Sequence, residues 1–333
     1  MGLTEFIYGS VDGVGEPLGT YAVMTMEVPW NLVKDRIGGT PTSVTMVRGL
    51  EREYLDGLAR ELPSVKAVVG IGGGMATDAA KYFAWKRGCS LLLVPTIVSV
   101  DAYASHEIAV RDNGVVSYIG NVTPARVVID YKAIRSAPSR LNTAGAGDAY
   151  ATRTALFDWK LSHDKTGESY DKEIADAARR GLDTLVANAS EVRKVTEKGI
   201  RTLVSHHVEM VRLCALAGKT RPGEGSEHVF FYTLEKITGR SFVHGEVVGT
   251  GIYLSSRFQS NEQDEVAQVM DSMGLIFRPK DCGISKQEFT DTLLRMKQYS
   301  QTKEERAVLP FSILDVVDIS REDAEELWRK LSS

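Results

Sequence analysis

The first third of the chain alternates short apolar runs with segments of helical periodicity. Apolar runs lie at residues 21–26 (YAVMTM), 42–47 (TSVTMV) and 65–74 (VKAVVGIGGG). Between the second and third runs, residues 50–63 repeat leucine or tyrosine at helical spacing. A helix is expected again over residues 75–88, and strands at 90–96 and 126–131. This alternation predicts βαβ units and a parallel sheet.

The pattern changes near residue 138, in the turn-rich stretch IRSAPSRLNTAG. Helical periodicity dominates from there on, and few β-rich runs remain. The expected helices are residues 147–161, 170–189, 190–216, 226–238, 246–259, 261–273 and 286–299. We therefore predict an α/β, Rossmann-like dinucleotide domain over residues 1–138 and an all-α domain over residues 139–333.

Composition adds little but excludes some classes of protein. The 333 residues are 43% hydrophobic and 25% charged, which is ordinary for a globular protein. A net charge of −4 argues against nucleic-acid binding. No apolar run is long enough for a membrane span, and the N-terminus lacks the layout of a secretory signal. Three widely spaced cysteines predict neither a disulfide framework nor a metal site, so a cytoplasmic protein is expected.

A glycine turn follows the third apolar run, in AVVGIGGGMATDAAK. Glycines between a strand and a helix let backbone N–H groups approach a phosphate, and the helix N-terminus adds a partial positive charge. The stretch matches neither GxGxxG nor a Walker A loop, so a plain tight turn stays open as an alternative. Asp78 and Lys81 lie on the following helix, where they either pair with each other or reach a ligand.

Two of the six histidines are placed for metal binding. His228 is expected in the first turns of one helix and His244 at the start of the next, with Glu227 and Glu246 as acidic neighbours that could orient them. One added carboxylate would complete a three-ligand metal site. Two histidines satisfied at helix ends are the alternative.

The remaining histidines have simpler expectations. His206 and His207 are adjacent on one helix and therefore face different directions, so they are expected to be solvated or locally bonded rather than joint ligands. His163 is expected in a surface loop.

The stretch NTAGAGDAYATR allows two roles for Asp148. A Gly-Ala-Gly-Asp turn before a helix is similar to the anion hole and catalytic base of ribokinase-type sugar kinases. In those kinases the motif comes late, after a β-rich domain, whereas here it lies before the midpoint of the chain. The other role is a metal ligand, with Gly145 and Gly147 forming the turn between the domains and Asp148 opening the first helix after it.

Five segments in order resemble the iron-containing alcohol dehydrogenase superfamily, which includes glycerol dehydrogenases and dehydroquinate synthases. They are GIGGGMATDAAK, LLLVPTIVSVDAYAS, AGAGDAYATRTALFDWKLS, GSEHVFFYTLEK and HGEVVGTGIYL. The closest resemblance is to the sn-glycerol-1-phosphate dehydrogenase branch. It extends over more than half of the chain and implies a dehydroquinate synthase-like fold.

The resemblance also implies a set of site residues. Gly72, Gly73, Gly74 and Asp78 would bind the NAD(P) cofactor, with Thr96 and Ser99 beside the nicotinamide; Asp101 would face the substrate hydroxyls; and Asp148, His228 and His244 would bind a divalent metal. Zn²⁺ is the first choice of metal, with Fe²⁺ or Ni²⁺ as alternatives. The implied reaction interconverts a small polyol or polyol phosphate and its ketone, sn-glycerol 1-phosphate and dihydroxyacetone phosphate above all. Asp101, Asp148, His228 and His244 are the expected catalytic residues, and a homo-oligomer is expected.

Three departures from the branch bear on specificity. The segment MEVPW follows the first strand, where Glu27 could reach a ribose 2′-hydroxyl and favour NAD. Glu224 stands where the branch has a small residue, and a carboxylate disfavours a nearby phosphate. Arg221 is the cation that would compensate by binding the substrate phosphate.

A sugar-phosphate cyclase related to dehydroquinate synthase is the alternative within the same fold. Such cyclases carry a lysine in the glycine-rich stretch after the residue equivalent to Asp101. The sequence DAYASHEIAV has none, which favours the dehydrogenase.

Overall fold

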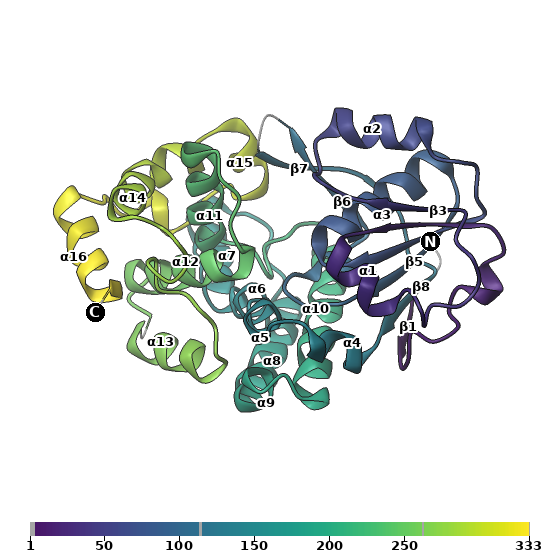
Figure 1. Cartoon of the computed structure of the whole chain (residues 1–333). Coiled ribbons are helices and arrows are strands. Elements are labelled where there is room, and N and C mark those ends of the chain that lie inside the picture. The colour runs from purple at the N-terminus through teal and green to yellow at the C-terminus, as the bar shows by residue number, and fades with distance from the viewer. Residues whose placement is uncertain (1–3, 113–114, 262, 333) are drawn as a thin grey trace. The chain divides into compact units, whose positions relative to one another are not determined.

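The computed structural model describes residues 4–112, 115–261 and 263–332. The chain divides into two compact units, Met1–Pro138 and Ser139–Ser333. The first is built on a parallel sheet and the second consists of helices (Figure 1). The prediction of an α/β part followed by an all-α part is therefore confirmed.

The sheet of the first unit has six strands in the order β1-β8-β5-β4-β2-β3, and every neighbouring pair is parallel. Its strands are β1 (Glu5–Tyr8), β2 (Tyr21–Thr25), β3 (Ser43–Met46), β4 (Ala67–Gly72), β5 (Ser90–Pro95) and β8 (Arg126–Ile129). A separate antiparallel hairpin pairs β6 (Glu107–Asp112) with β7 (Val115–Asn121). Strand order reverses between β2 and β4, the position at which doubly wound sheets bind ligands.

Helices connect the strands of the first unit. They are α1 (Glu27–Val33), α2 (Arg52–Glu61), α3 (Gly74–Arg87) and α4 (Tyr131–Ser136), with short 3-10 turns η1 (Glu16–Leu18) and η2 (Asp101–Tyr103). The predicted strands and the helices α2 and α3 agree with the structure to within about two residues. The sequence pattern did not predict β1, α1, α4 or the β6–β7 hairpin.

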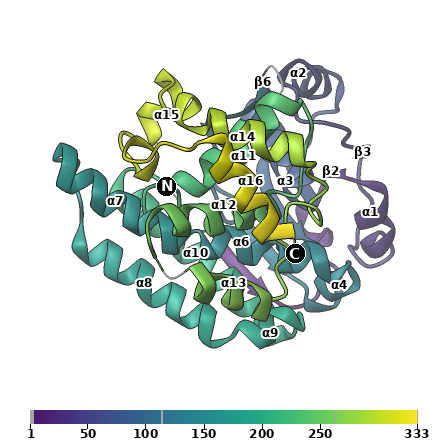
Figure 2. The same cartoon turned by 90° about the vertical axis from the view of Figure 1, so that its left-hand side faces the viewer.

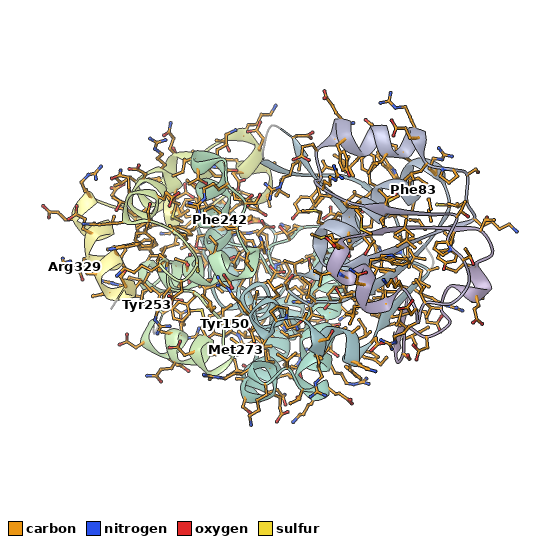
Figure 3. The ribbon with its side chains drawn as sticks, viewed as in Figure 1. Phe83, Tyr150, Phe242, Tyr253, Met273 and Arg329 are labelled. Carbon is orange, nitrogen blue, oxygen red and sulfur yellow. The ribbon has the colours of Figure 1, made fainter. Side chains whose placement is uncertain are left out.

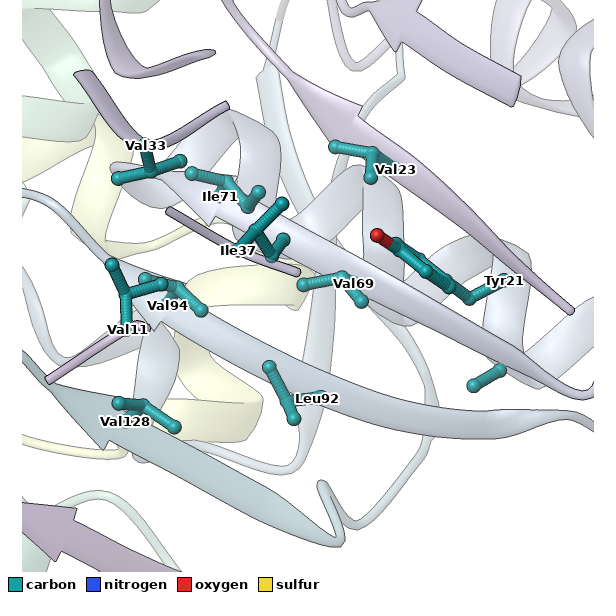
Figure 4. Packing of buried hydrophobic residues seen from close by; sticks show 11 residues of the cluster. Val11, Tyr21, Val23, Val33, Ile37, Val69, Ile71, Leu92, Val94 and Val128 are labelled. Carbon is teal, nitrogen blue, oxygen red and sulfur yellow. The ribbon is translucent and has the colours of Figure 1, made fainter. Parts of the chain in front are cut away.

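The core of the first unit lies against the central strands. Val23, Val69, Leu92 and Val128 come from β2, β4, β5 and β8 and point to one side of the sheet (Figure 4). The strands β2 and β4 are buried at every position, so they appear in the sequence as continuous apolar runs rather than as an alternating pattern.

The second unit contains helices α5 to α16 and one 3-10 turn. They are α5 (Ser139–Thr143), α6 (Gly145–Tyr150), α7 (Thr152–Thr166), α8 (Lys172–Ala187), α9 (Ala189–Arg193), α10 (Glu197–Ala217), α11 (Ser226–Thr238), α12 (His244–Phe258), α13 (Gln263–Ser272), α14 (Lys286–Ser300), α15 (Lys303–Val308), η3 (Ile313–Asp315) and α16 (Arg321–Ser332). The helix predicted over residues 226–238 has these bounds in the structure. The expectations omitted α5, α15 and α16. None of the described helices is long and apolar enough to cross a membrane.

Gly145 and Gly147 do not form the expected turn between two domains. Both lie inside α6, and α5 precedes it, so Asp148 is not at the start of the first helix of this unit. Two glycines in six residues favour a turn on propensity alone. Tertiary packing explains their presence in a helix, as described below.

His206 and His207 anchor α10 to the segment around Asp148. His206 Nε2 lies 3.5 Å from Thr152 Oγ1, and His207 Nε2 lies 3.3 Å from the carbonyl oxygen of Gly145. Both side chains are buried, so the expectation of local bonding holds and that of solvation does not. His163 is exposed, but it lies on α7 rather than in a loop. The adjacent helices α8 and α10 pack side by side (Figure 2).

The buried state of His206 predicts a pH-dependent stability. Burial, together with the neighbouring His207, lowers the pKa of His206 from 6.5 to about 4. The unfolded chain therefore binds this proton more tightly, and stability is lost as pH falls from about 6.5 to about 4. In metal-free protein, the free energy of unfolding should fall across this pH window in both proteins. We expect this fall to be about 1–3 kcal/mol smaller in His206→Gln than in the wild type.

Urea unfolding at several pH values with a chelator present measures this difference. His163→Gln is the matched control, because the His163 side chain is exposed and its replacement should leave the slope unchanged. Equal slopes for wild type and His206→Gln would rule out this effect of burial.

Candidate metal centre

Three helices of the second unit bring Asp148, His228 and His244 together. Asp148 lies on α6, His228 in the first turn of α11 and His244 at the first residue of α12. The Nε2 atoms of His228 and His244 lie 3.5 Å and 3.2 Å from Asp148 Oδ1. One ligand atom from each residue lies within 4.8 Å of the other two. His228 and His244, which follow Asp148 by 80 and 96 positions in the chain, thus meet it at one point.

Glycines permit this convergence by letting the helices touch through their backbones. A methyl group on Gly147 of α6 would lie 1.9 Å from the carbonyl oxygen of Gly245 on α12. A methyl group on Gly245 would lie 1.8 Å from the carbonyl oxygen of Ala144, and one on Gly251 would lie 2.2 Å from that of Glu227 on α11. No side chain fits at these distances, so only glycine allows α12 to pack this closely between α6 and α11.

Glu227 fixes the orientation of the His228 ring. Its Oε1 atom lies 2.8 Å from His228 Nδ1 and accepts a hydrogen bond from the backbone N–H of Gly225 at 2.5 Å. Its Oε2 atom accepts a 2.7 Å hydrogen bond from the Thr154 hydroxyl. With Nδ1 engaged, Nε2 is the His228 nitrogen that faces Asp148, which is the arrangement of a metal-binding histidine with a supporting carboxylate.

Glu246 does not play the matching role for His244. Its carboxylate accepts two hydrogen bonds from the guanidinium of Arg140, at 2.6 Å and 2.7 Å. This buried carboxylate instead ties the start of α12 to α5. The His244 ring is supported by Phe231, whose ring meets it edge-on with centroids 4.4 Å apart. Glu246 does not support the His244 ring because it lies two residues further along the helix and points to another face.

Opposite charges stabilise the cluster in its ionised form. Burial acts to raise the pKa of Asp148, but hydrogen bonds from His228 and His244 and their positive charges hold it well below its ordinary value. Burial acts to lower the pKa of His228, yet the bonds to Asp148 and Glu227 hold it well above its ordinary value. The carboxylate therefore stays ionised, as a metal ligand must be, and a bound metal would take the place of the proton on His228.

The three residues fit a divalent metal ion. One carboxylate oxygen and two imidazole nitrogens form a common donor set of catalytic zinc sites, which keep one position for water or substrate. The side chains of Asp148 and His244 remain 16% and 23% exposed, so one side of the cluster is accessible. Nitrogen ligands also suit Fe²⁺ and Ni²⁺, and the donor set alone does not select among them.

The glycine turn of the first unit has the geometry of a phosphate cradle. Gly72 ends β4 with φ of 145°, a conformation that favours glycine, and Gly73 precedes α3 without a side-chain cap. Thr96 follows β5, and its backbone N–H donates to the carbonyl oxygen of Gly72 at 3.0 Å. Gly72, Gly73, Gly74 and Thr96 thus share the carboxyl ends of two neighbouring strands, where the uncapped N–H groups of α3 are available to an anion.

The other predicted site residues of the first unit differ in their burial and in their hydrogen-bond partners. Ser99 is partly buried in the segment after β5, and Asp101 begins η2, where its carbonyl oxygen accepts from Ala104. Glu27 is exposed at the start of α1, directly after β2. Asp78 differs, because its buried carboxylate pairs with Lys81 at 3.0 Å and accepts from the backbone of β6. Asp78 therefore helps hold the β6–β7 hairpin on α3.

The structure gives Arg221 a different role from the expected one in phosphate binding. Its side chain is fully buried, and its guanidinium donates to the carbonyl oxygens of Asp158 and Phe311 at 2.8 Å and 3.1 Å. It also lies 3.4 Å from the Glu168 carboxylate. A substrate phosphate would have to displace these partners, so the prediction that Arg221 binds substrate is corrected to a structural role. Arg221 was selected for its charge and its position near Glu224, and neither feature indicates whether the side chain is buried.

Several residues that shape the centre have weak sequence signals. Asp158 accepts from the backbone N–H groups of Ser226 and Ile313, both at 2.8 Å, and so fixes the start of α11. Burial raises the pKa of Asp158 to about 6. The one available signal is an acid on the buried face of α7. Tyr150 of α6 and Tyr253 of α12 belong to the same helical unit (Figure 3).

Several curated proteins with similar sequences carry the same name. The chain is 30% identical over 335 residues to a glycerol-1-phosphate dehydrogenase [NAD(P)+] of Hyperthermus butylicus, covering 96% of this chain and 94% of the relative. A second, from Cenarchaeum symbiosum, is 30% identical and covers 87% and 77%. The family model for iron-containing alcohol dehydrogenase matches residues 28–138.

The chain belongs to the glycerol-1-phosphate dehydrogenase family. Within solved structures, a probable glycerol dehydrogenase of Sinorhizobium meliloti 1021 aligns with a TM-score of 0.75 and 20% identity, over 99% of this chain and 98% of that one. The glycerol dehydrogenase of Schizosaccharomyces pombe gives 0.73 and 20%, over 99% and 89%. The chain therefore has the fold of these two solved structures. The curated glycerol-1-phosphate dehydrogenase relatives favour an oxidoreductase over the kinase and cyclase alternatives.

The close helix contact predicts a sharp effect of one methyl group. Gly245→Ala forces α12 away from Ala144 and so separates His244 from Asp148. We expect a loss of about 1–3 kcal/mol of stability from overpacking and at least a tenfold loss of metal affinity in a chelator competition assay.

Gly57→Ala is the matched control, because Gly57 lies in α2 with nothing within 4 Å of an added methyl group. It should keep wild-type metal affinity. Unchanged metal affinity in Gly245→Ala would contradict the role of the glycine contact.

The two acidic neighbours of the histidines should differ in their effect on the metal. Glu227→Gln keeps the size of the side chain but removes the charge that supports His228, so metal affinity should fall about 10–100-fold. Glu246→Gln should reduce stability through Arg140 while leaving metal affinity within about threefold of the wild type. Metal titration and thermal unfolding of both variants separate these outcomes. The assignment fails if Glu246→Gln weakens metal binding as much as Glu227→Gln does.

Proposed function

We propose that this protein is a metal-dependent, NAD(P)-linked dehydrogenase that interconverts sn-glycerol 1-phosphate and dihydroxyacetone phosphate. The observation that carries the proposal is the convergence of Asp148, His228 and His244 from three helices. Membership of the glycerol-1-phosphate dehydrogenase family supports the substrate, because the curated relatives carry this name.

Asp148, His228 and His244 would hold the divalent ion, with Zn²⁺ as the preferred metal. Such an ion would supply Lewis-acid polarisation of the substrate oxygen, and the nicotinamide cofactor would supply the hydride. Glu227 keeps the His228 ring in one orientation, and Phe231 supports the ring of His244. Holding ligands rigidly reduces the reorganisation that the reaction would otherwise require.

The turn of Gly72, Gly73 and Gly74 would bind the cofactor pyrophosphate through the uncapped N-terminus of α3. Thr96 and Ser99, after β5, would lie beside the nicotinamide, and Asp101 would face the substrate. We propose NAD rather than NADP as the preferred cofactor, because the exposed Glu27 follows β2 and would repel a 2′-phosphate. A cytoplasmic homo-oligomer completes the proposal.

A reduction assay tests the function directly. Metal-free protein reloaded with Zn²⁺ should oxidise NADH in the presence of dihydroxyacetone phosphate, and more slowly with NADPH. The product should be resistant to an sn-glycerol-3-phosphate-specific dehydrogenase, because it is the opposite enantiomer. Asp148→Asn and His244→Gln should each reduce turnover by at least about 100-fold, since removing one of three protein ligands weakens the site.

Exposed His163→Gln is the control that should retain full turnover. Near wild-type activity and metal content in either ligand variant would exclude the assigned metal centre. Release of phosphate from a seven-carbon sugar phosphate without net cofactor turnover would instead identify a cyclase.

A further inference from the structure

The helix that carries His228 has no cap from the residue before it. Its first residue, Ser226, follows Gly225, which has no side chain to bind the free N–H groups of α11. The first N–H groups of a helix lack partners within it, and a buried N–H group without a partner costs stability. His228 lies two residues further along α11. Whatever binds the N–H of Ser226 therefore also sets where the backbone of His228 lies.

Asp158 of α7 supplies the missing partner. Its Oδ2 atom accepts a 2.8 Å hydrogen bond from the backbone N–H of Ser226, which lies 68 positions further along the chain. The Asp158 side chain is fully buried, so water does not compete for this bond. A methyl group on Gly225 would lie 2.9 Å from the Cα atom of Ala155 and 3.0 Å from Asp158 Oδ2. The chain before α11 therefore packs directly against α7.

The other carboxylate oxygen of Asp158 binds a remote segment of the chain. Oδ1 accepts a 2.8 Å hydrogen bond from the backbone N–H of Ile313, which lies 155 positions further along the chain. The Arg221 guanidinium joins the same segment, because one of its nitrogens donates to the carbonyl oxygens of Asp158 and Phe311. The Ile313 side chain is buried as well. Asp158 thus connects α7, the first turn of α11 and residues 311–313.

We infer that Asp158 is a positioning residue for the candidate metal ligand His228. By holding the first turn of α11 between α7 and residues 311–313, it fixes the backbone from which the His228 side chain extends. Metal–ligand distances tolerate deviations of only about 0.2 Å, so a small shift of this turn would weaken the bond to a metal. Glu227 orients the imidazole ring, whereas Asp158 fixes the backbone that carries it. The inference rests on the proposed function and deepens it, because residues 311–313 become part of the framework of the metal centre.

The substitution Asp158→Asn tests the inference, because it keeps the size of the side chain. Asparagine offers an oxygen to one of the two backbone N–H groups and an NH₂ group to the other, so one hydrogen bond is lost. Metal affinity, measured by chelator competition well below the unfolding temperature, should fall about tenfold or more. The visible absorption spectrum of the Co²⁺-loaded protein should change, because it reports the geometry of the ligands. Without metal, amide hydrogen exchange should become faster in residues 226–228 and 311–313 together.

Asp171→Asn is the matched control. Asp171 also caps a helix, because its Oδ1 atom accepts hydrogen bonds from the backbone N–H groups of Glu173 and Ile174 at the start of α8, at 2.9 Å and 3.1 Å. Helix α8 carries none of the three candidate metal ligands. This substitution should keep metal affinity within about threefold of the wild type and leave the Co²⁺ spectrum unchanged.

Two outcomes overturn the inference. One is a lower unfolding temperature in Asp158→Asn combined with the metal affinity and the Co²⁺ spectrum of the wild type, which would make Asp158 a purely structural residue. The other is wild-type amide exchange in residues 226–228 of Asp158→Asn.

Two further results are also decisive. If Asp158→Asn does not fold, Arg221→Lys is measured in its place and should show the same changes to a smaller degree, because lysine keeps the charge but alters the bonds to Asp158 and Phe311. Unchanged metal affinity in Arg221→Lys would then overturn the inference. A wild type that binds no metal would refute the proposed function, while amide exchange in Asp158→Asn would still decide whether Asp158 holds the first turn of α11.

Discussion

The candidate metal centre depends on backbone contact between three helices. Gly245 and Gly147 let α12 approach α6 so closely that a methyl group at either position would overlap a carbonyl group, and Gly251 does the same between α12 and α11. Helices packed through ordinary side chains have axes about 8–10 Å apart. Removing those side chains is what brings one carboxylate and two imidazoles to a single point.

Close packing also concentrates charge, and the surrounding residues compensate for it. Buried ionised groups are stable only when they are paired or hydrogen bonded. Asp148 meets two histidines, Glu227 is held by Thr154 and the backbone of Gly225, and Glu246 is paired with Arg140. Each carboxylate therefore has a partner, and the starts of α11 and α12 are each held by one of these carboxylates.

Sequence patterns predicted the elements well where local signals are strong. The strands β4 and β5 and the helices α3 and α11 have apolar runs, glycine stops or clear helix starts, and they lie close to their predicted positions. Short helices such as α5 and α15 carry too few residues for a periodic signal, and α5 is where Arg140 lies. The metal ligands were selected with the help of the resemblance, since histidine spacing alone left a second interpretation open.

The errors share a physical cause. Glycines such as Gly145 and Gly147 are typical both of a turn and of a close contact between helices. Only the presence of Gly245, which is distant in sequence, distinguishes the contact from the turn. Arg221 and Glu246 were judged by charge and by position along the chain, but their roles depend on Asp158 and Arg140, which are remote in sequence. Local sequence does not encode which buried partner satisfies a charge.

Anomalous diffraction from crystals of the metal-loaded protein tests the central claim most directly. The account predicts one ion bound by Asp148, His228 Nε2 and His244 Nε2, with ligand distances of about 2.0–2.2 Å if the ion is zinc. The ion should lie where α6, α11 and α12 meet. An ion held by a different set of residues, or a site in which one of these three side chains points away from the ion, would contradict the account.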